Sequence, residues 1–127
     1  MQIGMSYSCS ETVTADNTAD RVGSGLLSVY ATPSMIALME KCAATCVANS
    51  LDAGKTTVGT KIDIEHVSAS PLGMKITCTA TLTQIDNRRL VFSVEALDEK
   101  GLIGKGTHER FIVDVERFMQ KCESKRG

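Results

Sequence analysis

The sequence lacks the features that mark a membrane span, a secretory leader or a nucleic-acid-binding surface. No apolar run approaches the roughly 20 residues that a bilayer span requires, and the first residues, Met1 to Met5, contain no basic segment followed by an apolar one. The formal net charge is only −1, and Lys and Arg are scattered rather than clustered. We therefore expect a soluble, cytoplasmic protein that binds neither membranes nor nucleic acid.

Cysteine spacings typical of metal sites are also absent. The five cysteines, an odd number, stand at positions 9, 42, 46, 78 and 122, without the paired spacing of zinc sites. We expect reduced thiols, no metal and no cofactor. Cys42 and Cys46 are four residues apart and share one face of a predicted helix, where they can bind a metal or a redox partner, or be small core residues. Their neighbours Ala43 and Val47 favour the core.

Hydrophobic periodicity divides the chain into one long helix and several strands. The 127 residues are 43% hydrophobic, which suits a single domain over residues 1–127. Apolar and polar residues alternate in 74–85 and 90–97, as in strands with one buried face. Short turns predict antiparallel neighbours. The expected elements are a weak strand at 6–14, a loop with one helical turn at 15–31, a helix at 33–51, strands at 58–68, 74–85, 90–97 and 102–115, and a short amphipathic helix from Glu116 to about Cys122.

The first half of the long helix is apolar on nearly every side, from Met35 to Met39. A helix without a wide polar face is enclosed by other elements. The predicted fold is therefore α+β, a long central helix wrapped by a strongly twisted antiparallel β-sheet, which is the hot-dog arrangement. A general α+β sandwich with the helix on one face has the same element order, and periodicity does not separate the two.

A hydroxyl stands where the long helix begins. Pro33 suits the first position of a helix, because its missing N–H would have no partner there, so Thr32 is predicted to be the N-cap. A hydroxyl at a helix N-terminus lies beside free backbone N–H groups, which can stabilise a developing oxyanion. Thr32 can therefore be a plain capping residue or part of a hydrolytic site.

An imidazole and a carboxylate are predicted to face that hydroxyl. His66 has the same strand parity as Ile62 and Ile64, so it should face the helix. Glu40 has no ion-pair partner three or four residues away on its own helix, so it needs a partner from another element, and His66 is the natural one. Thr32 and Glu40 are about 12 Å apart along the helix axis, which leaves room for an imidazole between them. His66 would act as general base, on Thr32 or on a water.

Several segments resemble one known family. They are Tyr30–Glu40 (YATPSMIALME), Thr57–Thr60 (TVGT), Ile64–His66 (IEH) and Gly104–Arg110 (GKGTHER). Together they are similar to the fluoroacetyl-CoA thioesterase type of hot-dog proteins, in register from about Tyr30 to Phe118. The combination is fairly specific, although each piece alone would be weak.

The resemblance implies an acyl-CoA thioesterase with catalytic residues Thr32, Glu40 and His66. It also implies that Gly59 lies beside the acyl carbonyl and that Arg110 lies near the site or the CoA. CoA would be part of the substrate, not a cofactor. The expected assembly is a homodimer or a higher oligomer, with pockets at the subunit interface.

The chain departs from that family where acyl specificity is set. The family has an aromatic gate ahead of its ATP segment, whereas Gly23–Val29 contains no Phe. We therefore expect a short- or medium-chain acyl-CoA rather than the fluorinated one. Two other functions use the same fold: an acyl-CoA hydratase or dehydratase, and a non-catalytic acyl-CoA-binding dimer. The second histidine, His108, shares strand parity with Arg110. It can contact a CoA phosphate or the dimer partner, or be a solvated strand residue, and we expect the last of these.

Overall fold

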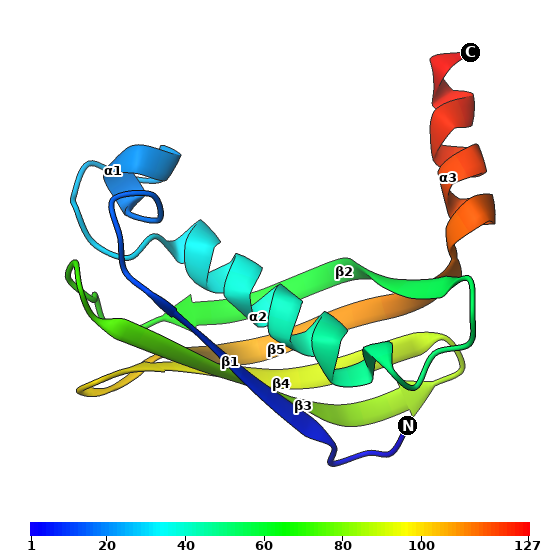
Figure 1. The fold of residues 1–127 in the computed structure, drawn as a ribbon, viewed down its shortest axis with the longest axis horizontal. Helices are drawn as coiled ribbons and strands as arrows, with labels where there is room; N and C mark the ends of the chain where they lie inside the picture. The colour runs from blue at the N-terminus through cyan, green and yellow to red at the C-terminus, as the bar shows by residue number, and fades with distance from the viewer.

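The computed structural model describes residues 1–127 as a single curved sheet holding one long helix (Figure 1). Element bounds differ from the sequence prediction by a few residues at most. In chain order the elements are β1 (Ser6–Thr12), α1 (Ala19–Val22), α2 (Thr32–Ala48), β2 (Lys55–His66), β3 (Lys75–Asp86), β4 (Arg89–Asp98), β5 (Gly101–Asp114), α3 (Val115–Glu123) and a 3-10 helix (Ser124–Arg126).

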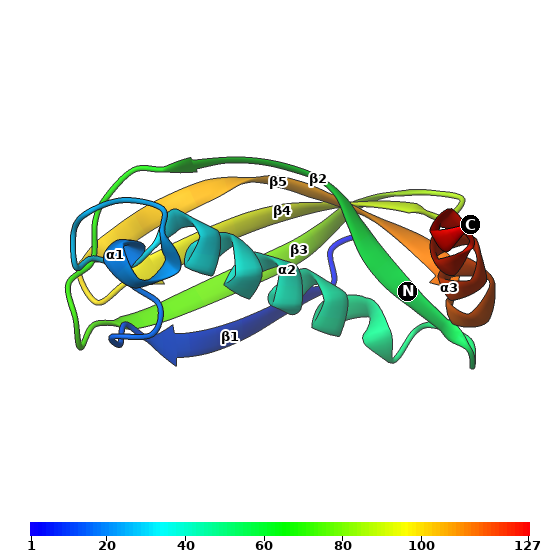
Figure 2. The same cartoon turned by 90° about the horizontal axis from the view of Figure 1, so that it is seen from above.

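The five strands form one antiparallel sheet in the order β1-β3-β4-β5-β2. The turn from β3 to β4 passes through Asn87, whose φ of 55° lies in the left-handed region that Asn tolerates well. Strand β2 occupies one edge, and its second edge has no partner within the chain. Figure 2 shows the sheet curving around α2, as the hot-dog prediction requires.

Helix α2 packs its apolar side into the concave face of the sheet. On the helix the fully buried side chains include Met35, Met39 and Val47, and the sheet supplies Leu82 and Phe92. This packing is the main core of the domain, because each such side chain contributes about 1.5–3 kcal/mol when buried. The core forms because α2 and the alternating strands present apolar residues to each other.

The opposite side of α2 is exposed, so the helix is not enclosed on every side within one chain. Ala37, Lys41 and Thr45 lie along this exposed side at intervals of four residues. The prediction of full enclosure is therefore wrong for the single chain. The apolar run from Met35 to Met39 includes Ala37, and an alanine side chain is small enough to be exposed at little cost.

The cysteines behave largely as core residues. Cys42 and Cys78 are fully buried, Cys46 is half-buried against the core, and all five thiols are free. The Cys42 thiol donates to the backbone carbonyl of Tyr7, at 2.8 Å. The interpretation of Cys42 and Cys46 as small core residues is confirmed.

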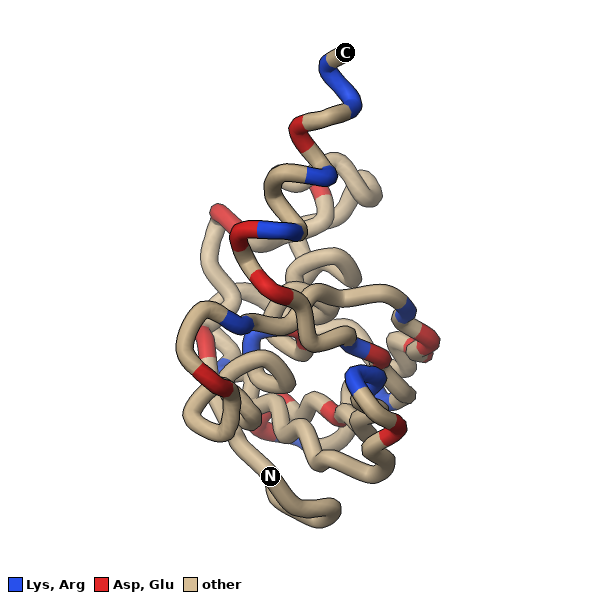
Figure 3. The backbone as a smooth tube through the Cα atoms, turned by 90° about the vertical axis from the view of Figure 1, so that its right-hand side faces the viewer, with Lys and Arg blue, Asp and Glu red and all other residues tan.

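Charges of both signs are interspersed over the molecule, including the C-terminal helix α3, which projects away from the sheet (Figure 3). None of the helices combines the length and the apolar character needed to span a bilayer, and the longest, α2, has 17 residues.

Candidate active site

Thr32 and His66 form a direct hydrogen bond at the N-terminal end of α2. The distance between Thr32 Oγ1 and His66 Nδ1 is 2.7 Å. His66 is the last residue of β2, and its strand parity turns it toward the helix, as predicted. The prediction that Thr32 is the N-cap is wrong by one residue: Ala31 is the N-cap, and Thr32 is the first helical residue. Its hydroxyl is thus engaged by the imidazole rather than by the helix backbone.

The environment of His66 favours its neutral form. Burial lowers the pKa of this imidazole below its usual 6.5, because the charged form loses solvation. The ring atom Nε2 is buried and has no hydrogen-bond partner in the chain. When Nδ1 accepts the Thr32 proton, Nε2 must carry a proton and needs an acceptor. A neutral imidazole hydrogen-bonded to a hydroxyl is an arrangement in which the ring can accept the hydroxyl proton.

A cavity of about 290 Å³ opens beside this pair. Its walls come from α1, the segment before α2, the start of α2 and the end of β2. The lining residues are Ala19, Ser24, Val29, Tyr30, Thr32, His66, Val67, Ser68 and Ala69. A cavity of this size is at the small end of ligand pockets in proteins, which run from about 300 to 1,000 Å³. Thr32 and His66 therefore border a space suited to a small group.

Glu40 lies elsewhere in the chain, two turns further along α2. It forms no hydrogen bond or ion pair with His66; its partner is Arg110, whose Nη1 lies 3.6 Å from Glu40 Oε2. The predicted pairing of Glu40 with His66 is wrong within one chain. The sequence pattern indicated only His66 on β2 as the partner of Glu40. The partner is Arg110 on β5, the strand that pairs with β2 in the sheet.

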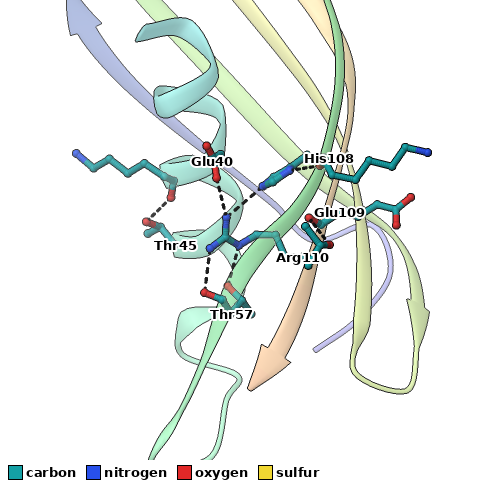
Figure 4. A network of polar contacts seen from close by, with 9 residues as sticks. Glu40, Thr45, Thr57, His108, Glu109 and Arg110 are labelled. Atoms are coloured by element: carbon teal, nitrogen blue, oxygen red, sulfur yellow. Dashed lines mark hydrogen bonds and ion pairs between the residues drawn. The ribbon is translucent and has the colours of Figure 1, made fainter. Parts of the chain in front are cut away.

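Arg110 is held by a network behind Glu40 (Figure 4). Its Nε donates to Thr57 Oγ1 at 2.8 Å, and its Nη2 donates to the Thr57 carbonyl at 2.9 Å. Only 9% of the Arg110 side chain is exposed, against 43% for Glu40. Burial lowers the pKa of Arg110, and Glu40 opposes that effect. Arg110 is therefore oriented by β2 and presents its remaining N–H groups toward the carboxylate.

Gly59 on β2 leaves the space that this pair occupies. A Cβ built on Gly59 would lie 2.7 Å from Glu40 Oε2 and 3.3 Å from Arg110 Nη1. Any side chain at position 59 would therefore displace the carboxylate. Both residues that the resemblance assigned to binding, Gly59 and Arg110, meet at Glu40, while Thr32 and His66 lie at the other end of β2.

His108 is buried, so its expected exposure is wrong. Only 1% of the residue is accessible to solvent. Nδ1 lies 2.7 Å from the Lys61 carbonyl, and Nε2 lies 3.1 Å from Arg110 Nη1. The shared parity of His108 and Arg110 was a usable signal, because two residues of one parity face the same side of a strand. The role of Thr57 in holding Arg110 was not predictable from the sequence, since threonine is common in strands.

Comparisons with known proteins agree with this fold. A family model described as fluoroacetyl-CoA-specific thioesterase matches residues 13–116. The curated fluoroacetyl-CoA thioesterase of Streptantibioticus cattleyicolor is 39% identical over 97 residues, covering 76% of this chain and 70% of that protein.

Solved structures extend the likeness to nearly the whole chain. A crystal structure of the fluoroacetyl-CoA thioesterase FlK is 32% identical with a TM-score of 0.94, covering 98% of this chain and 97% of that one. A Phe-to-Ala variant of that enzyme is known in complex with fluoroacetate and CoA. A hot-dog-like protein from Thermanaerovibrio acidaminovorans, 22% identical, has a TM-score of 0.91 over 98% of this chain and 93% of that one, which supports the fold.

The curved sheet, its central helix and these relatives define a hot-dog thioesterase, which confirms the predicted fold class and enzyme class. The protein is a thioester hydrolase. The chain belongs to the fluoroacetyl-CoA-specific thioesterase family.

Proposed function

We propose that the protein hydrolyses a short- or medium-chain acyl-CoA to a carboxylate and free CoA. The observation that carries the proposal is the 2.7 Å bond between Thr32 and His66 at the edge of a small cavity. The complex of the related enzyme with CoA supports a CoA thioester as the substrate class. CoA enters as part of the substrate.

In this mechanism Thr32 is the nucleophile and His66 is the general base. The Thr32 oxygen attacks the thioester carbonyl carbon while its proton moves to His66 Nδ1. The carbon–sulfur bond then breaks, and the CoA thiolate takes that proton from His66. A water next attacks the acyl–threonine ester, passing a proton through His66 back to Thr32, and the acid leaves. Backbone N–H groups in the first turn of α2 have no intrahelical partner and suit the oxyanion.

The third group of the site, Glu40, is proposed to come from a second copy of the chain. Within one chain Glu40 contacts Arg110 through Oε2 and forms no hydrogen bond or ion pair with His66, whose Nε2 lacks an acceptor. Both positions border the free edge of β2: Gly59 on β2 lies beneath Glu40, and His66 ends the strand. A carboxylate from a partner at this edge would accept from His66 Nε2 and orient the imidazole, which requires the atoms that cover Nε2 in the single chain to move aside.

The geometry of β2 suits such a homodimer. The strand has 12 residues, and its unpaired edge is a ready template for a second strand. Two-fold symmetry makes the added strand antiparallel. A pairing centred between Ile62 and Asp63 sets Gly59 of one copy opposite His66 of the other. The Glu40 carboxylate above Gly59 would then approach the imidazole of the second copy.

The cavity and its rim set the proposed acyl preference. Its volume of about 290 Å³ favours short acyl groups. The neighbouring segment Gly23–Val29 has no Phe, so no aromatic side chain of this segment can close over a fluorinated substrate. Its Leu26 is 95% exposed and does not cover the cavity. A general short acyl group is therefore the proposed substrate. The five free thiols fit a reducing compartment, and we propose a cytoplasmic location.

Thiol release from a series of acyl-CoA esters tests the proposal. Acetyl-, butyryl-, hexanoyl- and fluoroacetyl-CoA are offered at equal concentration, and free CoA is measured with a thiol reagent. We expect turnover of the short esters, a fall in kcat/KM with chain length, and no large advantage for fluoroacetyl-CoA. Saturable binding without thiol release would refute the hydrolase mechanism.

Mixed dimers test the origin of Glu40. Glu40→Ala and His66→Ala chains, each inactive alone, are co-expressed with different tags, and the heterodimer is isolated. If the carboxylate comes from the second copy, the heterodimer contains one intact site and regains up to half of the wild-type rate. If each site belongs to one chain, no intact site forms and the heterodimer stays inactive.

A further inference from the structure

His108 stands behind Arg110 in the same network, and its surroundings fix its protonation state (Figure 4). The Lys61 carbonyl can only accept a hydrogen bond, so Nδ1 must be the donor in that 2.7 Å contact. Arg110 Nη1 can only donate, so Nε2 must accept in the 3.1 Å contact. The ring is therefore neutral, with its single proton on Nδ1.

This neutral ring leaves Arg110 little freedom. Thr57 holds the guanidinium through Nε and Nη2, and His108 holds Nη1, so three contacts define its plane. The same Nη1 faces Glu40 Oε2 at 3.6 Å. Because Gly59 has no side chain, nothing else separates the guanidinium from the carboxylate. The position of Glu40 is thus set by a group that His108 orients.

We propose that His108 is a positioning residue for the thioesterase reaction, acting through Arg110 on the carboxylate of Glu40. The inference rests on the proposed role of Glu40 in the site. No hydrogen bond joins His108 to Thr32 or His66, and its one side-chain hydrogen-bond partner is Arg110, so Arg110 and Glu40 form the proposed route of its effect on the reaction. A misplacement of about 1 Å at a catalytic group is enough to cost about 100-fold in rate.

The charged surroundings of His108 come from three elements. Arg110 and Glu109 lie on the same strand, Glu40 lies on α2, and the β2 contact is the backbone carbonyl of Lys61. Phe92 of β4 packs near the ring, with centroids 6.4 Å apart. Burial and Arg110 lower the pKa of His108, whereas the Lys61 contact and the two carboxylates raise it. Protonation would place a second cation against Arg110.

A double-mutant cycle on acyl-CoA hydrolysis separates this role from a merely structural one. His108→Leu removes both ring contacts, and we expect kcat to fall by about 10- to 100-fold with KM within about threefold. His108→Gln offers a side-chain oxygen to Arg110 Nη1 and should recover much of the loss. Arg89→Gln is the matched control: Arg89 pairs with Glu109 at 2.9 Å, and no side-chain hydrogen bond or ion pair joins it to Arg110 or Glu40, so the rate should be unchanged.

The decisive comparison is with Glu40→Gln. If His108 acts through Glu40, the double variant Glu40→Gln/His108→Leu is no slower than Glu40→Gln alone. If the two losses multiply, or if His108→Leu keeps the wild-type kcat, the inference is wrong. If His108→Leu does not fold, the same cycle is run with His108→Asn, which keeps a donor for Lys61 and loses the acceptor for Arg110.

The two proposals fail in different ways. If the wild-type protein releases no CoA, or Glu40→Gln is fully active, the proposed function or its site is wrong. If the wild type is active and Glu40→Gln is impaired while His108→Leu is not, only the role of His108 is wrong.

Discussion

Thr32 Oγ1 and His66 Nδ1 lie 2.7 Å apart, joining the first turn of α2 to the last residue of β2. This contact places a hydroxyl, an imidazole and free backbone N–H groups at one cavity. In the proposed mechanism this hydrogen bond links the nucleophile, Thr32, to its general base, His66.

The hydroxyl of Thr32 is predicted to be essential while its methyl group is not. Thr32→Ser should keep most of the activity, and Thr32→Ala should lose at least about 100-fold in kcat, the usual scale for losing a nucleophile or its proton transfer. Rapid-mixing kinetics and intact-protein mass should also reveal an acyl adduct on the wild type. Equal rates for the serine and alanine variants would contradict a chemical role of the hydroxyl.

A side chain at Gly59 should displace the Glu40 carboxylate, because its Cβ would lie 2.7 Å from Glu40 Oε2. We expect Gly59→Ala to fold and to lose about 10-fold or more in kcat as the carboxylate is displaced. Gly25→Ala is a matched control, since its Cβ would meet only Ala19 Cβ, at 3.4 Å. Wild-type turnover by Gly59→Ala would show that the position of Glu40 is unimportant.

Gly106 is predicted to be needed for stability. A Cβ there would overlap the carbonyl oxygen of Asp63 and lie 2.7 Å from Ile64 Cα, so β2 would have to move away from β5. Gly106→Ala should lower the free energy of unfolding by about 1–3 kcal/mol, the range for overpacking. Urea denaturation measures this change, and an unchanged midpoint would mean that the strands separate without cost.

Stability should fall as the pH drops below 6.5, because the native pKa values of His66 and His108 are both lowered. In the unfolded chain these imidazoles take up protons near pH 6.5, before the native protein does, so protonation favours unfolding. The loss grows until the pH reaches the lowered native pKa values.

Urea denaturation at several pH values between 8 and 5.5 measures this loss. The double variant His66→Asn/His108→Gln should have a smaller slope in that interval. Glu109 and Asp98 also have lowered pKa values, but the stability that they contribute is lost only at more acidic pH, where carboxylates become protonated. A wild-type stability that does not change between pH 7 and 5.5 would contradict the lowered histidine pKa values.

Much of the fold was predictable because local patterns decide it. The alternation in β3 and β4 and the short turn between them predicted strand bounds within a few residues. The same parity rule turned His66 toward the helix, where it meets Thr32. These features depend on neighbours along the chain, which is why periodicity predicts them.

The rest of the site depends on contacts between distant elements. Arg110 contacts Glu40 from β5 through its long side chain. The two residues are far apart in the sequence, so local spacing does not predict this contact. His108 is buried because Lys61 and Arg110 satisfy both of its nitrogens, and a polar residue type alone does not predict that. The pairing of Glu40 with His66 was predicted because Glu40 lacks a partner on its own helix, although within one chain Glu40 lies above Gly59 and pairs with Arg110.

Hydrolysis by the His66→Asn variant is the most direct test of the central claim. Wild type and variant are compared on acetyl-CoA by thiol release, with circular dichroism to confirm that both are folded. We predict a fall in kcat of at least about 100-fold with little change in KM, because the variant loses the general base but keeps the cavity. A folded His66→Asn protein that releases CoA at the wild-type rate would contradict the assignment of the active site.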